Sequence, residues 1–198
     1  MALMNLELFT GGSVATNGYL LEDGGVTLLI DAPSGIFDWL QRKDLYPDHL
    51  LLTHQHFDHV EDAHLFDCPT HAFSPFSHEL ILDKQAKAWG LPVNVPDFQV
   101  SEILAEKESL TLGNFAFDLL HVPGHSPDSL VFSLPQANLA FVGDTLFNQS
   151  TGRTDLPGGN HELLFKGIRE KLLTLPSEYR LYPGHGPHTS PENEKNSF

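Results

Sequence analysis

Cysteine is almost absent from this chain of 198 residues, in which Cys68 stands alone. One cysteine excludes an internal disulfide, and few cysteines are typical of proteins kept in reducing compartments. The N-terminal segment also lacks the basic start of a secretory signal peptide, and Glu7 interrupts its apolar residues early. We therefore predict a cytoplasmic protein. Cys68 is interpreted as a buried structural residue, with a catalytic thiol as the alternative.

Long apolar runs and basic residues are scarce as well. No apolar segment approaches the roughly 20 residues that a membrane-spanning helix needs. Eleven basic residues stand against 26 acidic ones, which gives a net charge of −15. Nucleic acids and anionic membrane surfaces both bind basic faces, so this charge argues against either partner. Since no repeat, low-complexity segment or linker interrupts the chain, we predict one domain over residues 1–198.

Histidine, in contrast, is abundant, with twelve residues. The segment Thr53–His59 (THQHFDH) contains three of them and one aspartate, and it follows an apolar run at 49–52 that predicts a buried strand. If the chain stays extended, His54 and His56 point to the same side, because side-chain direction repeats every two residues in a strand. An exposed polar turn is the alternative interpretation of this segment.

Three later segments repeat the same context of apolar run, glycine and polar residue. They are Gly124-His125, Gly143-Asp144 and Gly184-His185. Glycine allows the sharp turns and close backbone approach that a site built from strand-end loops requires. The recurrence favours a metal site over an exposed turn.

In this order, the His-x-His-x-Asp-His, Gly-His, Gly-Asp and Gly-His motifs resemble those of the metallo-β-lactamase fold superfamily. The resemblance runs from Asn17 to the C-terminus. Within that superfamily, Gly143–Phe147 followed by Thr151–Gly159 is most similar to the short, single-domain glyoxalase II-like (hydroxyacylglutathione hydrolase-like) proteins. The ending Tyr182–Pro187 is similar to the same group.

The resemblance implies an α/β (α+β) fold, an αββα four-layer sandwich with two mixed β-sheets flanked by helices. The hydrophobic pattern itself predicts elements along the whole chain. A hairpin is expected around Gly24-Gly25 and another around Gly113-Asn114, and Ser34 is the expected N-cap of the first helix. The expected strands lie at 6–9, 17–30, 49–52, 70–73, 109–120, 139–142 and 180–182, and the expected helices at 34–42, 77–90 and 160–175.

The resemblance also implies a binuclear metal centre with seven ligands. Its first metal position is formed by His54, His56 and His125. The second position is formed by Asp58, His59 and His185, and Asp144 bridges the two. These nitrogen and oxygen ligands, with no thiolate, suit two divalent ions of Zn, Fe or Mn. Asp58 and Asp144 are the implied catalytic carboxylates.

The activity that the resemblance implies is hydrolysis of a small-molecule thioester or ester, with S-acylglutathione-like thioesters as the first choice. A metal-bridging hydroxide would attack the carbonyl. The main alternative is an iron-dependent persulfide dioxygenase with one iron. A lactonase or another ester hydrolase, and a non-enzymatic binding protein with a relic metal site, are weaker alternatives. The oligomeric state stays open.

Four residues around the motifs keep more than one interpretation each. Arg153 either pairs with Asp155 inside the loop or holds a substrate carboxylate at the mouth of the site. Asp31 either supports a ligand or is a polar strand end. Asp128, where relatives often have glycine, tunes the pocket, repels anionic substrates or caps a turn. His121 is a second, less favoured ligand candidate beside His125.

Overall fold

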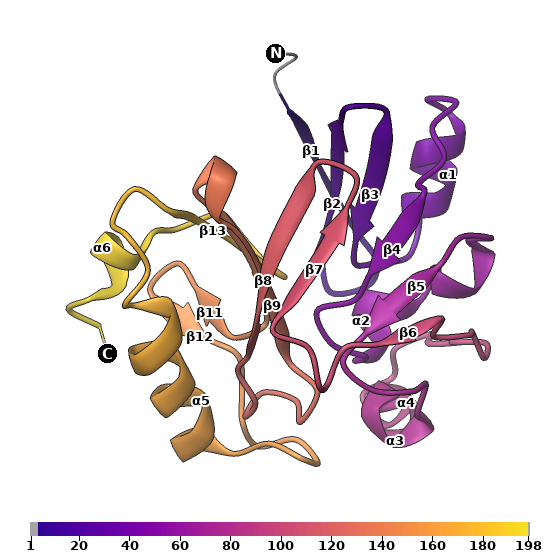
Figure 1. Cartoon of the computed structure of the whole chain (residues 1–198). Coiled ribbons are helices and arrows are strands. Elements are labelled where there is room, and N and C mark those ends of the chain that lie inside the picture. Colours follow the sequence, from indigo (N-terminus) through magenta and orange to yellow (C-terminus); the bar gives the residue numbers. More distant parts are fainter. Residues whose placement is uncertain (1–3, 198) are drawn as a thin grey trace.

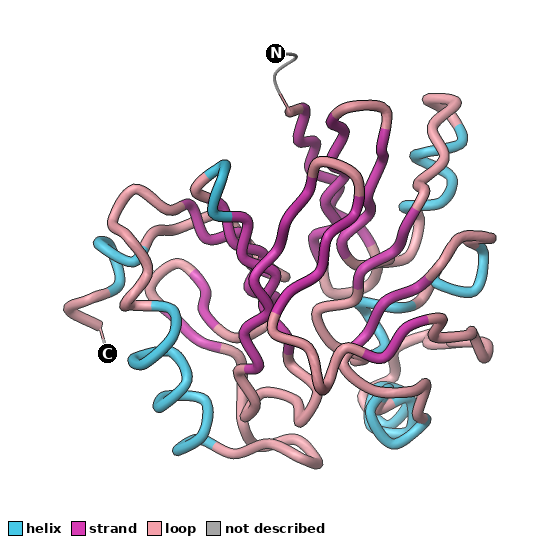
Figure 2. The backbone as a smooth tube through the Cα atoms, in the orientation of Figure 1, coloured by secondary structure: helices cyan, strands magenta, loops and turns pink. Residues whose placement is uncertain are grey.

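Two β-sheets packed face to face, with helices on both outer faces, form the architecture of the protein (Figure 1). The structure is a computed structural model, and it describes residues 4–197. Helices α1 to α4 cover the first sheet, and α5 covers the second (Figure 2). This arrangement confirms the predicted αββα sandwich with two mixed sheets.

The first sheet has six strands in the order β1-β2-β3-β4-β5-β6. Strands β1 to β3 pair antiparallel, whereas β3 to β6 pair parallel, so the sheet is mixed. The predicted hairpin at Gly24-Gly25 connects β2 to β3, and both glycines have positive φ. The six strands are β1 (Asn5–Gly11), β2 (Thr16–Asp23), β3 (Val26–Ile30), β4 (His49–Leu51), β5 (Thr70–Ala72) and β6 (Glu102–Ile103).

The second sheet has five strands in the order β13-β10-β9-β8-β7. All pairs are antiparallel except β10 with β13, which is parallel. A short ribbon of β11 (Leu146–Phe147) and β12 (Ser150–Thr151) follows β10. The five strands are β7 (Ser109–Leu112), β8 (Phe115–His121), β9 (Leu130–Leu134), β10 (Leu139–Gly143) and β13 (Arg180–Pro183).

Both faces of the central strands are covered, and their side chains alternate between two apolar cores. Leu21 points into the core between the sheets, while its neighbour Leu20 points into the core under the helices of the first sheet. A third core joins the second sheet to α5 through Leu164 and Leu181. The period of two residues follows from the alternating side-chain directions of a strand. Packing on both faces fixes the position of the sheets, and therefore also the positions at which the loops at their edges begin and end.

The first two predicted helices differ from expectation. The first, α1 (Ile36–Gln41), does not begin at Ser34: its N-cap is Gly35, with φ 91°. Asp62 replaces the predicted cap, because its carboxylate accepts the N–H groups of Gly35 (2.9 Å) and Phe37 (3.0 Å). A residue distant in sequence thus satisfies the free N–H groups of the first turn.

The predicted helix at 77–90 begins as expected, with Ser77 accepting a hydrogen bond from the N–H of Glu79. Leu82, with φ 59°, then breaks it into α3 (His78–Ile81) and α4 (Asp83–Ala88). A left-handed residue cannot continue a right-handed helix. The continuous helix predicted here is therefore wrong.

The remaining helices are α5, which covers the second sheet, and two short helices. The helix predicted at 160–175 is α5 (His161–Gly167), capped by Asn160 and continued by a π-helical turn (Ile168–Leu172). Short helices α2 (Phe57–Val60) and α6 (Pro191–Glu194) complete the set, with 3-10 turns at Ala63–Leu65 and Pro135–Ala137. Over residues 4–197, none of these helices has the length and apolar character needed to cross a bilayer.

Cys68 packs beside the core under the helices, next to Phe66, and lies apart from all predicted ligands. Burial, followed by the nearby charges of Asp48 and Asp67, raises the pKa of its thiol to about 11. Thiolate is the reactive form, so a pKa raised by about two units lowers reactivity at pH 8 by roughly 100-fold. We expect the native protein to be alkylated by iodoacetamide about that much more slowly than the urea-unfolded chain. Equal rates would contradict the half-buried placement of Cys68.

Candidate metal centre

The predicted site residues lie at one edge of the sandwich, at the carboxyl ends of four strands. His54 and His56 follow β4, His125 follows β8, Asp144 follows β10 and His185 follows β13. Strands β8, β10 and β13 run in the same direction, because β9 is antiparallel to both of its neighbours and β13 is parallel to β10. Their loops therefore emerge at the same edge. Asp58 and His59 reach this edge from α2.

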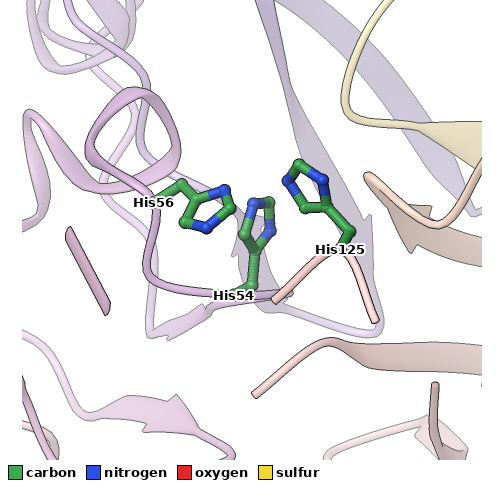
Figure 3. Close-up of side chains that lie close together, drawn as sticks. All are labelled: His54, His56 and His125. Atoms are coloured by element: carbon green, nitrogen blue, oxygen red, sulfur yellow. The ribbon is translucent and has the colours of Figure 1, made fainter. Parts of the chain in front are cut away.

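Three groups of three side chains occupy the site, and one of them, His54, His59 and Asp144, shares residues with the other two. In the first, His54, His56 and His125 converge from two segments (Figure 3), with ring centroids 4.5 to 5.0 Å apart. The second is Asp58, His59 and His185. In each group, one nitrogen or oxygen atom per residue lies within 4.8 Å of those of the other two. Each group can hold one metal ion.

Asp144 lies between the two groups. Its Oδ1 is 3.3 Å from His59 Nε2, and its Oδ2 is 3.4 Å from His125 Nε2 and 3.3 Å from His185 Nε2. Ligand atoms about 2.0–2.2 Å from a shared tetrahedral ion lie roughly 3.3–3.6 Å apart, so these distances suit ligands of common ions. The structure thus brings all seven predicted residues together, with Asp144 in the middle position.

Unpaired buried atoms provide a second test of the fit to a metal. Within residues 4–197, His54 Nε2, His59 Nε2, His125 Nε2 and Asp144 Oδ1 are buried and have no hydrogen-bond partner. Buried polar atoms are otherwise almost always paired, because an unpaired one costs about 1–3 kcal/mol. All four atoms belong to the groups that could hold a metal, whereas a fifth such atom, Oε2 of Glu61, lies outside them. A cation is the partner that such lone pairs lack.

The other ring nitrogen of these histidines is fixed by a neighbour. His125 Nδ1 lies 2.9 Å from the carbonyl oxygen of Arg153, and His59 Nδ1 lies 2.7 Å from Asp31 Oδ2. A carbonyl or carboxylate oxygen only accepts, so each Nδ1 donates. In the neutral form of each ring, the Nε2 atom therefore carries the lone pair, as a metal ligand requires.

The protonation states suit ligands as well. Burial, and then the nearby His125, lowers the pKa of His56 to about 3, and burial holds the pKa of His54 well below its usual range. Burial alone would raise the pKa of Asp58, but the charge of His59 and the His185 ring 3.3 Å away lower it to about 2. Neutral imidazoles and ionised carboxylates are the states that bind metals.

Positive charge is also favoured in the second group. Burial disfavours the charged form of His185, but the carboxylates of Asp144 and Asp58, each 3.3 Å away, raise its pKa to about 10. The hydroxyl of Thr16 adds a 2.6 Å hydrogen bond to Asp58. The two buried carboxylates therefore stabilise positive charge between them. A divalent ion carries twice the charge of a proton and would balance both carboxylates.

Asp31 supports the site, which decides between its two interpretations. Besides His59, its carboxylate accepts the N–H (2.8 Å) and the hydroxyl (2.7 Å) of Thr53. Its backbone has φ 59°, a conformation that aspartate and asparagine tolerate better than most residues. The side chain thereby ties the end of β3 to the start of the His54 segment and orients the ring of His59.

Asp31→Asn is expected to weaken the second metal position by about 10- to 100-fold, because outer hydrogen-bond partners of metal ligands contribute effects of that size. The asparagine NH₂ would face His59 Nδ1, which then accepts and leaves the proton on Nε2. We expect the variant to fold and to lose about one metal per chain on dialysis, measured by elemental analysis. Full retention of both metals would contradict this role.

Asp128 links the two histidine segments of the first group. It is buried, and its carboxylate accepts the N–H of Gln55 (3.0 Å) and the hydroxyl of Ser126. Burial raises its pKa to about 6. Asp128 therefore fixes the loop between His54 and His56 relative to His125, a long-range role that none of its interpretations from sequence included.

Two further predicted candidates occupy other positions. His121 stacks on Phe73, with ring centroids 4.0 Å apart, and its Nε2 lies 2.8 Å from the carbonyl oxygen of Pro127. It is outside both metal-binding groups. Arg153 pairs with Asp155 through two hydrogen bonds of 2.7 and 2.8 Å, as the first interpretation predicted. It also lines the pocket over the site, and its role in holding a substrate carboxylate stays a prediction.

Sequence comparison assigns this architecture to a family. Residues 11–185 match the model of the metallo-beta-lactamase superfamily, and the chain belongs to that family. It is 35% identical to the probable metallo-hydrolase YqgX of Bacillus subtilis, over 94% of this chain and 93% of YqgX. It is 34% identical to the hydroxyacylglutathione hydrolase GloC of Haemophilus influenzae, over 98% of this chain and 96% of GloC. Family and relatives identify a metal-dependent hydrolase.

Solved structures agree with this assignment. The BLEG-1 B3 metallo-beta-lactamase superposes with a TM-score of 0.85 at 32% identity, covering 97% of each chain. TTHA1623, solved in a di-iron-bound form, superposes with a TM-score of 0.81 at 35% identity, covering 96% of this chain and 98% of its own.

Proposed function

We propose that the protein is a binuclear metal-dependent thioesterase that hydrolyses S-acylglutathione-like thioesters. The observation that carries the proposal is the pair of three-residue groups on either side of Asp144, together with the buried, unpaired Nε2 atoms of His54, His59 and His125. His54, His56 and His125 would hold one ion, and Asp58, His59 and His185 the other. Bound divalent ions lower the pKa of water to about 7 and stabilise negative charge on a carbonyl oxygen.

The rest of the pocket favours a thioester over an amide. Its side chains other than predicted ligands are Val14, Phe57, Leu82, Trp89, Arg153 and Leu156. Of these, only Arg153 ionises, and the neighbouring Asp155 raises its pKa further, so it stays protonated. A thiol with a pKa near 8.5 leaves as thiolate without a general acid, whereas an amine needs a proton. Lining residues of this kind support thioester cleavage over β-lactam cleavage.

Two relatives bear on the choice of substrate and metal. GloC is named a hydroxyacylglutathione hydrolase, and TTHA1623 holds two irons. BLEG-1 is titled a β-lactamase, so a β-lactam belongs among the test substrates. Nitrogen and oxygen ligands without thiolate suit Zn, Fe or Mn.

Metal analysis of protein purified without added metal, with turnover of S-lactoylglutathione measured on the same sample, tests the proposal. We expect about two Zn, Fe or Mn per chain, loss of turnover with a chelator and recovery when metal is restored. One iron per chain, with oxygen uptake on glutathione persulfide and no thioester cleavage, would replace the proposal with a dioxygenase. Turnover of a β-lactam but not of thioesters would also overturn it.

A further inference from the structure

Above the metal centre lies a pocket with an apolar side. Its volume is about 170 Å³, and predicted ligands, among them His56, His125, Asp144 and His185, form its base. Val14, Leu82, Trp89 and Leu156 line the pocket as well, and we call these four residues the apolar wall. They come from three separate segments of the chain. An apolar lining with a few convergent polar groups is the usual composition of a small-molecule site.

Leu82 is held toward this pocket by an unusual backbone conformation. Its φ of 59° lies in the left-handed region, which is strained for a bulky residue such as leucine. Its neighbours Ile81 and Ala86 pack in the core under the first sheet, whereas the side chain of Leu82, only 4% exposed, lines the pocket. Strained residues persist where the surrounding structure fixes them, and they gather at binding sites. The break between α3 and α4 thus places an apolar side chain over the metal centre.

Trp89 forms the outer part of the wall at the end of α4. Half of its surface is exposed, and the guanidinium of Arg153 lies 5.4 Å from its ring centroid. Arg153 is paired with Asp155 through two hydrogen bonds. Of the described side chains lining the pocket, apart from the histidines at its base, Arg153 alone is cationic, and Asp155 already offsets its charge. A substrate with several negative charges therefore gains little binding free energy from Arg153.

From this arrangement we infer that the apolar wall is an acyl-binding subsite, which selects thioesters whose acyl group is apolar and no larger than a short alkyl chain or one aromatic ring. The inference rests on the proposed thioesterase function. An apolar cavity of roughly 150 Å³ takes a molecule the size of benzene, so the volume fits such a group. The thiol carrier then extends past the paired Arg153 toward solvent.

A series of acyl chains on one thiol isolates this subsite. Burying one methylene changes an equilibrium or rate by up to roughly fourfold. We expect kcat/KM of the metal-loaded protein to rise at least tenfold from S-acetylglutathione to S-hexanoylglutathione, which adds four methylenes. Leu82→Gly and Trp89→Ala should each reduce this ratio to about threefold or less.

Control variants separate the subsite from general damage. Glycine adopts left-handed φ without strain, so Leu82→Gly removes the side chain and keeps the turn. Asn138→Gly makes the same change at another left-handed position, φ 53°, outside the pocket. Tyr46→Ala matches Trp89→Ala, because Tyr46 is an aromatic residue 62% exposed and also outside it. Both controls should keep the wild-type ratio, and a reduced ratio in either would overturn the assignment.

Binding of thioethers, which cannot be hydrolysed, tests the subsite without turnover. We expect S-hexylglutathione to bind at least tenfold tighter than S-methylglutathione by calorimetry, and the two wall variants to lose this preference. Selective binding without hydrolysis of any thioester would keep the subsite and refute the thioesterase. Hydrolysis with equal kcat/KM and equal binding across chain lengths would refute the subsite alone. If the protein shows neither chain-length selectivity nor hydrolysis, both the subsite and the thioesterase function are refuted.

Discussion

Replacing Asp144 by alanine is expected to lower thioester turnover by at least about 1,000-fold and to reduce the bound metal. Its two carboxylate oxygens lie 3.3–3.4 Å from His59, His125 and His185, so the side chain contacts residues of both groups. Its pKa is held well below the usual range, since the charge of His59 and the nearby histidines outweigh burial. Alanine would leave two cations facing each other across a buried space, and removing a partner from buried charges is strongly unfavourable.

Turnover of S-lactoylglutathione and elemental analysis on the same sample measure this effect. Asp118→Ala is the matched control, because Asp118 is an exposed aspartate on β8 and its loss changes the net charge equally. The control should keep metal and activity. Full activity in Asp144→Ala would show that the assignment of two metals is wrong.

Gly184→Ala should have the second largest effect, a loss of turnover of at least about 100-fold together with lower metal content. A Cβ at this position would lie 2.1 Å from Asp144 Oδ1 and 2.5 Å from His59 Cε1. Carbon atoms normally approach other atoms to about 3.5–4.0 Å, so the methyl group would enter the space between the ligands. The backbone cannot retreat easily, because Gly184 N–H donates to Gly143 and Gly184 O accepts from Asn17.

Gly186→Ala separates this clash from general destabilisation. Gly186 has φ 72°, so alanine is strained there by about 1 kcal/mol, but its Cβ would meet no described atom within 4 Å. We expect Gly186→Ala to lose some thermal stability and to keep both metals and most turnover. If Gly184→Ala instead retained its metals while Gly186→Ala lost them, the packing described around Asp144 would be incorrect.

Much of the fold could be predicted because its signals are local. The buried strand at 49–52 was expected from a continuous apolar run, and β4 ends one residue earlier, at Leu51. The hairpin at Gly24-Gly25 followed from glycine turn chemistry. The helices at 34–42 and 77–90 were less accurate, because Asp62 and the strained Leu82 decide their boundaries through tertiary contacts. Local propensity does not contain those contacts.

By itself, the sequence determined the class of protein and the residues that meet at its site. Four of these residues are close in sequence, namely His54, His56, Asp58 and His59, and the Gly-His and Gly-Asp motifs follow apolar strands. The residue types of these motifs, their order and their spacing were therefore sufficient for the prediction. Only the tertiary structure decided which residues support and surround them. Asp31 reaches His59, Asp128 reaches Gln55, and Leu82 and Trp89 form a wall with Val14. Asp31 and His59 are 28 residues apart in the sequence, and Asp128 and Gln55 are 73 apart. Only the packing of two sheets and a broken helix brings such residues together.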